Sequence, residues 1–172
     1  LETLGLSSLR ELTLTGNPLE TIPSNIGEFT TLETLYLGQT GLTDLPSEIG
    51  MMTNLQGLFL DNNALSELPN EISNLQNLRE LSLSNNNFED IPPEIADLPR
   101  LQTLIVDKNS LTDCRILARL VTLTELKLSH NQLTSLNGLE RLTNLNTLWA
   151  NNNHLTTCMG LPASPLLSVL SL

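Results

Sequence analysis

Three of the five aromatic residues of this 172-residue chain occupy the same position in a recurring leucine pattern. Tyr36, Phe59 and Trp149 each stand between two small or branched apolar residues, as in Leu58-Phe59-Leu60. If those neighbours point into a core, the aromatic ring points to the opposite, solvent face of a strand. Rings kept at such a position are typical of surfaces that fill pockets on a partner protein. The alternative is that aromatic residues suit strands and only cover their cross-strand neighbours.

Charged residues accompany this aromatic row. Asp61 and Asp107 follow two residues after Phe59 and Ile105 and therefore share their face, where they could pair with lysine or arginine of a partner. The alternative is that they only solvate the surface. We also expect Gly38 and Gly57 to leave room beside the rings for a partner side chain. The predicted protein-binding residues are Tyr36, Phe59, Asp61, Ile105, Asp107, Lys127 and Trp149.

The residues that most often carry catalysis form no recognisable set. Cys114 and Cys158 replace leucine anchors of the pattern two repeats apart, so we expect buried free thiols about 10 Å apart, beyond disulfide reach. His130 and His154 lack the companions of a metal or nucleophile site. No glycine loop for phosphate is present. The sequence therefore predicts a protein that is not an enzyme and has no cofactor.

A column of acidic residues recurs once per repeat, at Asp44, Glu67, Asp90 and Asp113. Stacked carboxylates at one flank would repel one another unless a cation or a basic partner neutralised them. Calcium is conceivable, but no close multidentate set is present, so we expect a solvated edge.

The elements that must position these residues follow from an internal repeat with the frame LxxLxLxxNxL. Its spacing is 23 residues four times and 22 residues three times. In each unit leucines such as Leu55, Leu58 and Leu60 are expected to anchor a short strand inward, and stacked units would form a parallel sheet. The repeats begin at Leu9, Leu32, Leu55, Leu78, Leu101, Leu123 and Leu145, with a final strand at Leu167.

Two further positions define the turns between strands. An asparagine after each strand, interrupted at Thr40, is expected to satisfy backbone groups and to stack into a ladder. Prolines with an acidic residue two positions later, as in Pro46 and Glu48, suit the first turn of a short helix. This signal weakens from Leu101 onward, so we expect short α or 3-10 turns that become irregular.

These motifs resemble those of the intracellular leucine-rich-repeat family, from Leu9 to about Leu161. The LPxxI repeats, such as LPSEI, resemble the class in Ras-pathway scaffolds and Roco proteins. The last three repeats resemble the 22-residue class of a phosphatase-regulatory subunit and a dynein light chain. The resemblance implies an α/β fold, a right-handed curved solenoid with its parallel sheet on the concave face, which binds proteins there.

Charge and composition limit the classes of partner and the cellular compartment that we expect. A net charge of −11 argues against nucleic acid and anionic membranes, and favours a neutral or basic protein surface. Two cysteines and no Asn-x-Ser/Thr acceptor suggest a reducing, cytoplasmic compartment, with an extracellular piece as the alternative. Residues 1–172 are expected to form one domain, an excerpt of a longer protein, because Leu1 to Ser8 break register and Ser164 replaces an apolar anchor.

Three functional hypotheses remain open from the sequence. The first is a recognition module that uses the concave row, within a signalling scaffold. The second is a structural spacer held by its ends and convex flank. The third is the regulatory arm of a larger enzyme, such as a Roco GTPase or kinase or a phosphatase complex. The oligomeric state is not predicted.

Overall fold

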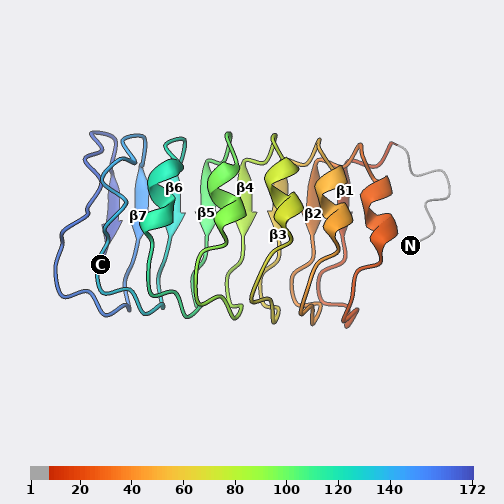
Figure 1. Ribbon diagram of the computed structural model, residues 1–172, viewed down its shortest axis with the longest axis horizontal. Helices are drawn as coiled ribbons and strands as arrows, with labels where there is room; N and C mark the ends of the chain where they lie inside the picture. Colours follow the sequence, from red (N-terminus) through yellow and green to blue (C-terminus); the bar gives the residue numbers. More distant parts are fainter. Residues whose placement is uncertain (1–7) are drawn as a thin grey trace.

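The chain winds into successive turns that stack along one axis, in a computed structural model that describes residues 8–172 (Figure 1). Each turn contributes one short strand to a single parallel sheet whose strands follow the order of the sequence. Paired residues are 23 positions apart from Glu11–Thr34 to Glu80–Thr103 and 22 apart from Thr103–Glu125 onward, which confirms the predicted repeat. The strands are β1 (Glu11–Thr13), β2 (Thr34–Tyr36), β3 (Gly57–Phe59), β4 (Glu80–Ser82), β5 (Thr103–Ile105), β6 (Glu125–Lys127), β7 (Thr147–Trp149) and β8 (Val169–Ser171).

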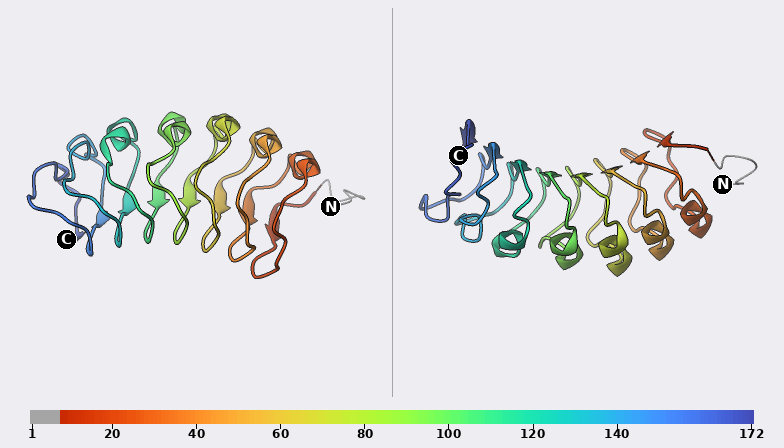
Figure 2. Two further views of the ribbon diagram at one scale, coloured as in Figure 1. Left: turned by 60° about the horizontal axis from the view of Figure 1, so that its bottom comes forward. Right: turned by 90° about the horizontal axis from the view of Figure 1, so that it is seen from above.

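Short 3-10 helices form the outer side of the coil, and the row of strands lies on the inner side of the arc (Figure 2). Each helix joins one strand to the next in the first five turns. The later turns cross the outer side without a helix among the described residues, where the proline signal is also weak. The predicted fold class, a curved solenoid with a parallel sheet on its concave face, is confirmed. The helices are η1 (Ser24–Glu28), η2 (Ser47–Met51), η3 (Asn70–Asn74), η4 (Pro93–Asp97) and η5 (Arg115–Arg119).

The prolines before these helices lie one residue earlier than expected. Pro46 is the N-cap of η2 with extended backbone angles, and its carbonyl oxygen accepts a hydrogen bond from the amide of Ile49 at 3.1 Å. Proline therefore presets the entry into the helix instead of forming its first turn. The predicted acidic residues do lie in the first turn, as Glu48 does in η2.

The core is the interior of the coil. The central leucine of each inner strand, such as Leu35, Leu58 and Leu104, is fully buried, and Phe29 and Phe88 are buried too. At the last strand the equivalent Leu170 is 46% exposed. Each turn buries its leucines against the next one, and β8 has no following turn within residues 8–172.

The asparagine ladder is confirmed. The Asn63 amide nitrogen donates to the carbonyl oxygens of Leu60 and of Leu37 in the preceding turn, both at 2.9 Å. Its oxygen accepts the amide of Leu42 at 3.1 Å. The Thr40 hydroxyl donates to the carbonyl oxygen of Leu37 at 2.7 Å and lies 3.0 Å from the side-chain oxygen of Asn63 in the next turn, so it replaces part of the bonding of an asparagine. From Asn63 onward, the asparagine at this position thus connects two turns as well as closing its own.

The expectation of two buried thiols is half wrong. Both cysteines are free, and Cys114 is buried, with its thiol directed at the carbonyl oxygens of Ser135 and Asn137. Burial raises the pKa of the Cys114 thiol to about 12. Cys158, however, is exposed, because residues 8–172 include no segment one repeat further on that would cover it. Ser164 uses its hydroxyl to donate to the carbonyl oxygen of Thr143, at 2.9 Å.

The register break predicted for Leu1 to Ser8 falls almost wholly outside the described residues, which begin at position 8.

Shortly after each of the strands β1 to β7, the chain changes direction at one residue with a left-handed backbone conformation. The residues are Gly16, Gln39, Asn62, Asn85, Lys108, His130 and Asn152. Asparagine adopts this conformation more readily than lysine does.

Lys108→Asn is therefore expected to raise the free energy of unfolding by about 0.5 kcal/mol. Its backbone φ is 54°, which disfavours a lysine side chain. Urea unfolding monitored by circular dichroism measures the change, and Asn85→Lys should have the opposite effect. An unchanged or lower midpoint for Lys108→Asn would contradict this account.

Candidate functional site

The predicted row of large side chains lies on the solvent side of the concave sheet. Tyr36, Phe59, Ile105 and Lys127 are half-buried, and Trp149 is 43% exposed. None of them belongs to the buried core. The row is interrupted at Ser82, which pairs with both Phe59 and Ile105 and is only 3% exposed. The geometry therefore divides the row into an aromatic pair on β2 and β3 and a second group on β5 to β7.

The two rings of the first group stack on each other. Their centroids are 4.6 Å apart and their planes differ by 12°. The Phe59 ring also covers Gly57, where an added Cβ would lie 3.0 Å from the ring. Gly38 is closed as well, because an added Cβ would lie 3.3 Å from the carbonyl oxygen of Asp61. The expectation that Gly38 leaves room for a partner is therefore wrong, since the chain's own atoms fill the space, whereas Gly57 lines an open hollow.

A small hollow of about 210 Å³ opens instead beside the rings. The predicted binding residues include Tyr36 and Phe59 of its lining but not Arg79 or Glu80, although the register of β2 to β4 places these residues on neighbouring strands. Its lining residues are Thr34, Tyr36, Gln56, Gly57, Phe59, Arg79 and Glu80.

The two predicted carboxylates are already hydrogen-bonded within the chain. One oxygen of Asp61 accepts the hydroxyl of Ser82 and the amide of Ser84. One oxygen of Asp107 accepts the amide of Ser129 at 2.6 Å. In the part of the chain that the structure describes, the second oxygen of each has no hydrogen bond and remains available to a partner.

Burial raises the pKa of Asp107, although the Ser129 amide and the nearby Lys127, His130 and Lys108 oppose this effect. The folded state therefore holds this proton to a higher pH than the unfolded chain does. It follows that Asp107 lowers the stability of the fold as pH rises from the ordinary value of 3.8 through the raised value.

Asp107→Asn is expected to remove this pH-dependent loss of stability. The side-chain oxygen of asparagine can still accept the hydrogen bond from the Ser129 amide, but it carries no charge. The measurement is the difference in free energy of unfolding between variant and wild type at several pH values from about 4 to 7. This difference should shift in favour of the variant as pH rises. A difference that shifts the other way would show that hydrogen bonding outweighs burial.

Lys127 is neutralised within its own strand. Its ammonium group lies 2.9 Å from a carboxylate oxygen of Glu125. Arg10 is likewise paired with Glu33. Within residues 8–172, Arg79 and Glu80 take part in no ion pair, so the two charges that line the hollow are not neutralised by another side chain.

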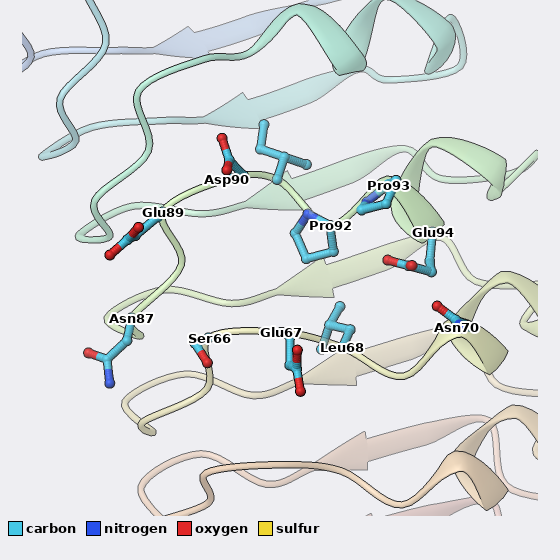
Figure 3. A pocket seen from close by; sticks show the side chains of 11 residues that line it. Ser66, Glu67, Leu68, Asn70, Asn87, Glu89, Asp90, Pro92, Pro93 and Glu94 are labelled. Atoms are coloured by element: carbon cyan, nitrogen blue, oxygen red, sulfur yellow. The ribbon is translucent and has the colours of Figure 1, made fainter.

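The acidic column forms part of a second hollow, of about 410 Å³, on the flank of the coil (Figure 3). Glu67, Glu89, Asp90 and Glu94 line it, together with Asn70. Glu94 and Asn70 come from two neighbouring helices, and the others come from the preceding loops. Among residues 8–172 no group of three or more His, Cys, Asp or Glu side chains has the geometry for a metal ion.

Further along the column, Asp113 is neutralised by its neighbour. Arg115 donates hydrogen bonds to it, and these hold the pKa of Asp113 below its usual value. The column is therefore not a uniform row of free carboxylates.

A family model described as a leucine-rich repeat region matches residues 55–161, and a second, described as Leucine Rich Repeat, matches residues 8–29. The chain belongs to the leucine-rich-repeat family. No curated protein matches the chain.

Among solved structures with this leucine-rich-repeat fold, a protein of Leptospira interrogans is 35% identical, with a TM-score of 0.87 over 89% of this chain and 40% of its own. An internalin of Listeria monocytogenes is 31% identical, with a TM-score of 0.82 over 95% of this chain and 48% of its own. The plant peptide hormone receptor RGFR1 in complex with RGF2 is 31% identical, with a TM-score of 0.65 over 77% of this chain and 22% of its own. The chain thus spans less than half the length of these three proteins.

None of the described helices has the length and apolar character needed to cross a membrane.

Proposed function

We propose that this leucine-rich-repeat chain is a non-catalytic recognition module that holds a partner protein against its concave sheet. The observation that carries the proposal is the solvent-facing position of Trp149 and of the stacked Tyr36 and Phe59. Aromatic side chains in such positions contribute most of the binding energy of many interfaces. The proposed contacts are Tyr36, Phe59, Asp61, Ile105, Asp107, Lys127 and Trp149.

The structural neighbours support this use of the fold. RGFR1 was solved as a complex with RGF2, so a related solenoid is part of a receptor for a peptide hormone. For this chain we propose a protein partner with a neutral or basic surface, because the chain carries a net charge of −11. We further propose a role in an intracellular scaffold, supported by two cysteines that both remain unpaired.

The test is affinity capture from cell lysate with the wild type and with the triple variant Tyr36→Ala, Phe59→Ala, Trp149→Ala. We expect the variant to lose at least about tenfold of the captured partner, since each buried aromatic anchor contributes about 1 to 2 kcal/mol. Mass spectrometry identifies and quantifies the captured proteins.

A matched control removes equally exposed apolar side chains away from the concave sheet. Met51 and Val121 are 55% and 48% exposed and lie on the convex side, so Met51→Ala with Val121→Ala should leave capture unchanged. Thermal melts of all variants should stay close to the wild type. Equal capture by the triple variant would reject the concave site.

A structural spacer is the second candidate, favoured by the exposed apolar end. Leu166, Leu170 and Leu172 are each about half exposed at the last turn, at 55%, 46% and 46%. If the chain acts through this end, Leu170→Ser with Leu172→Ser should abolish assembly while the aromatic triple variant still assembles.

A further inference from the structure

The hollow beside Tyr36 and Phe59 combines aromatic rings with an unpaired carboxylate. Glu80 lines the same hollow as the two rings and takes part in no ion pair within the described chain. Gly57 contributes no side chain, so the hollow is lined mainly by the two rings, by Gln56 and by the two charged residues Arg79 and Glu80. Its volume of about 210 Å³ suits a single side chain and not a folded domain.

The electrostatic surroundings favour a cation in this hollow. From Glu11 to Leu78 the chain contains nine acidic residues and no lysine or arginine. Asp61 follows Phe59 by two residues and does not line the hollow, but its second oxygen makes no hydrogen bond within residues 8–172. A cation beside aromatic rings is attracted by the negative potential of their faces, and the nearby carboxylates add to this attraction.

Arg79 is the one opposing charge in the lining. Its side chain is exposed and makes no ion pair among residues 8–172, so it can move away from an incoming cation. Its presence gives a test of sign: a bound cation would be repelled by Arg79, and a bound anion would be attracted by it.

We propose that this hollow receives a lysine or arginine side chain from an extended segment of the partner protein. The proposal rests on the function proposed above and adds the chemical class of the ligand. The rows on the concave face run across the strands, and Trp149 lies four strands beyond Phe59, about 19 Å away at sheet spacing. An extended chain covers this distance in about six residues. The segment is therefore expected to carry a basic residue and, about six positions away, an apolar residue that contacts Trp149.

The test begins with a random twelve-residue peptide library displayed on phage and selected on the wild-type chain. Selected peptides should be enriched in lysine or arginine, with an apolar residue about six positions away. Enrichment of peptides without basic residues, or of no peptides, would overturn the proposal.

Charge substitutions then test the hollow with the best selected peptide, by fluorescence polarisation. Glu80→Gln should weaken binding about two- to fivefold, the range of one cation interaction at a partly exposed site. Arg79→Gln should strengthen binding by a similar factor. Glu67→Gln, which removes an equal charge on the flank, should leave binding unchanged. Reversed signs for Glu80→Gln and Arg79→Gln would show that the hollow takes an anion and would overturn the proposal.

The same peptide separates this proposal from the proposed function. If Tyr36→Ala, Phe59→Ala and Trp149→Ala together leave its binding unchanged, both proposals fail, because the peptide binds elsewhere. If the aromatic substitutions abolish binding but the charge substitutions have reversed effects, the proposed concave binding site is supported. Only the proposal that the hollow receives a cation then fails. Circular dichroism melts of each variant ensure that lost binding does not reflect unfolding.

Discussion

Asn86→Ala is expected to lower the free energy of unfolding by about 3 kcal/mol, because it leaves buried backbone groups without partners. The amide nitrogen of Asn86 donates to the carbonyl oxygens of Leu60 and Leu83, both at 3.0 Å. Its oxygen accepts the amide of Leu65, also at 3.0 Å. The side chain is only 8% exposed, so water cannot replace these bonds. Urea denaturation followed by circular dichroism measures the loss.

Asn17→Ala is the matched control. Asn17 holds the same repeat position, but it is exposed, and within residues 8–172 its amide donates only to the carbonyl oxygens of Leu14 and Thr15 in its own turn. Water can satisfy these groups, so the expected loss is below about 1 kcal/mol. Similar losses for the two variants would mean that the connection between turns adds little stability.

Gly138→Ala is expected to destabilise the fold by about 4 kcal/mol, because the new methyl group would collide with the backbone of the preceding turn. An added Cβ would lie 2.5 Å from the Cα of Arg115 and 2.9 Å from its carbonyl oxygen. Neither backbone atom can move without displacing the first turn of η5. The Gly138 φ of 104° also disfavours alanine. Thermal and urea unfolding should both show the change.

Gly41→Ala separates steric collision from backbone strain. Gly41 also has a left-handed backbone, with φ 77°, but an added Cβ would have no atom within 4 Å. Only the conformational penalty of about 1 kcal/mol is expected there. If Gly41→Ala destabilises the chain as much as Gly138→Ala does, close approach of the turns is not the cause.

The fold could be predicted well from the sequence because every repeat has the same pattern of inward-facing leucines. Leucines such as Leu58 and Leu104 recur at fixed spacing, and a change of spacing from 23 to 22 residues reappears in the strand register. Burial at the ends was harder to predict. Cys158 occupies an anchor position but is exposed, because burial in a solenoid depends on the next turn and not on the residue itself.

The candidate site could be predicted only in outline. The repeat fixed the face on which Tyr36 and Phe59 lie, but rotamers and hydrogen bonds depend on neighbouring turns. The Phe59 ring lies over Gly57, and one oxygen of Asp61 is held by Ser82 and Ser84. Arg79 and Glu80 line the hollow although they lie at the start of β4, one turn after Phe59. The role of all these residues in binding stays a prediction.

The strand order has a consequence for how the molecule comes apart. Because β1 to β8 pair only with their neighbours along the chain, no strand pairing within residues 8–172 connects the first turn to the last. The last described turn, in which Leu170 is about half exposed, can therefore unfold locally without disturbing the central strands. Amide protons should thus exchange with solvent along a gradient, fastest at the tips and slowest around β4.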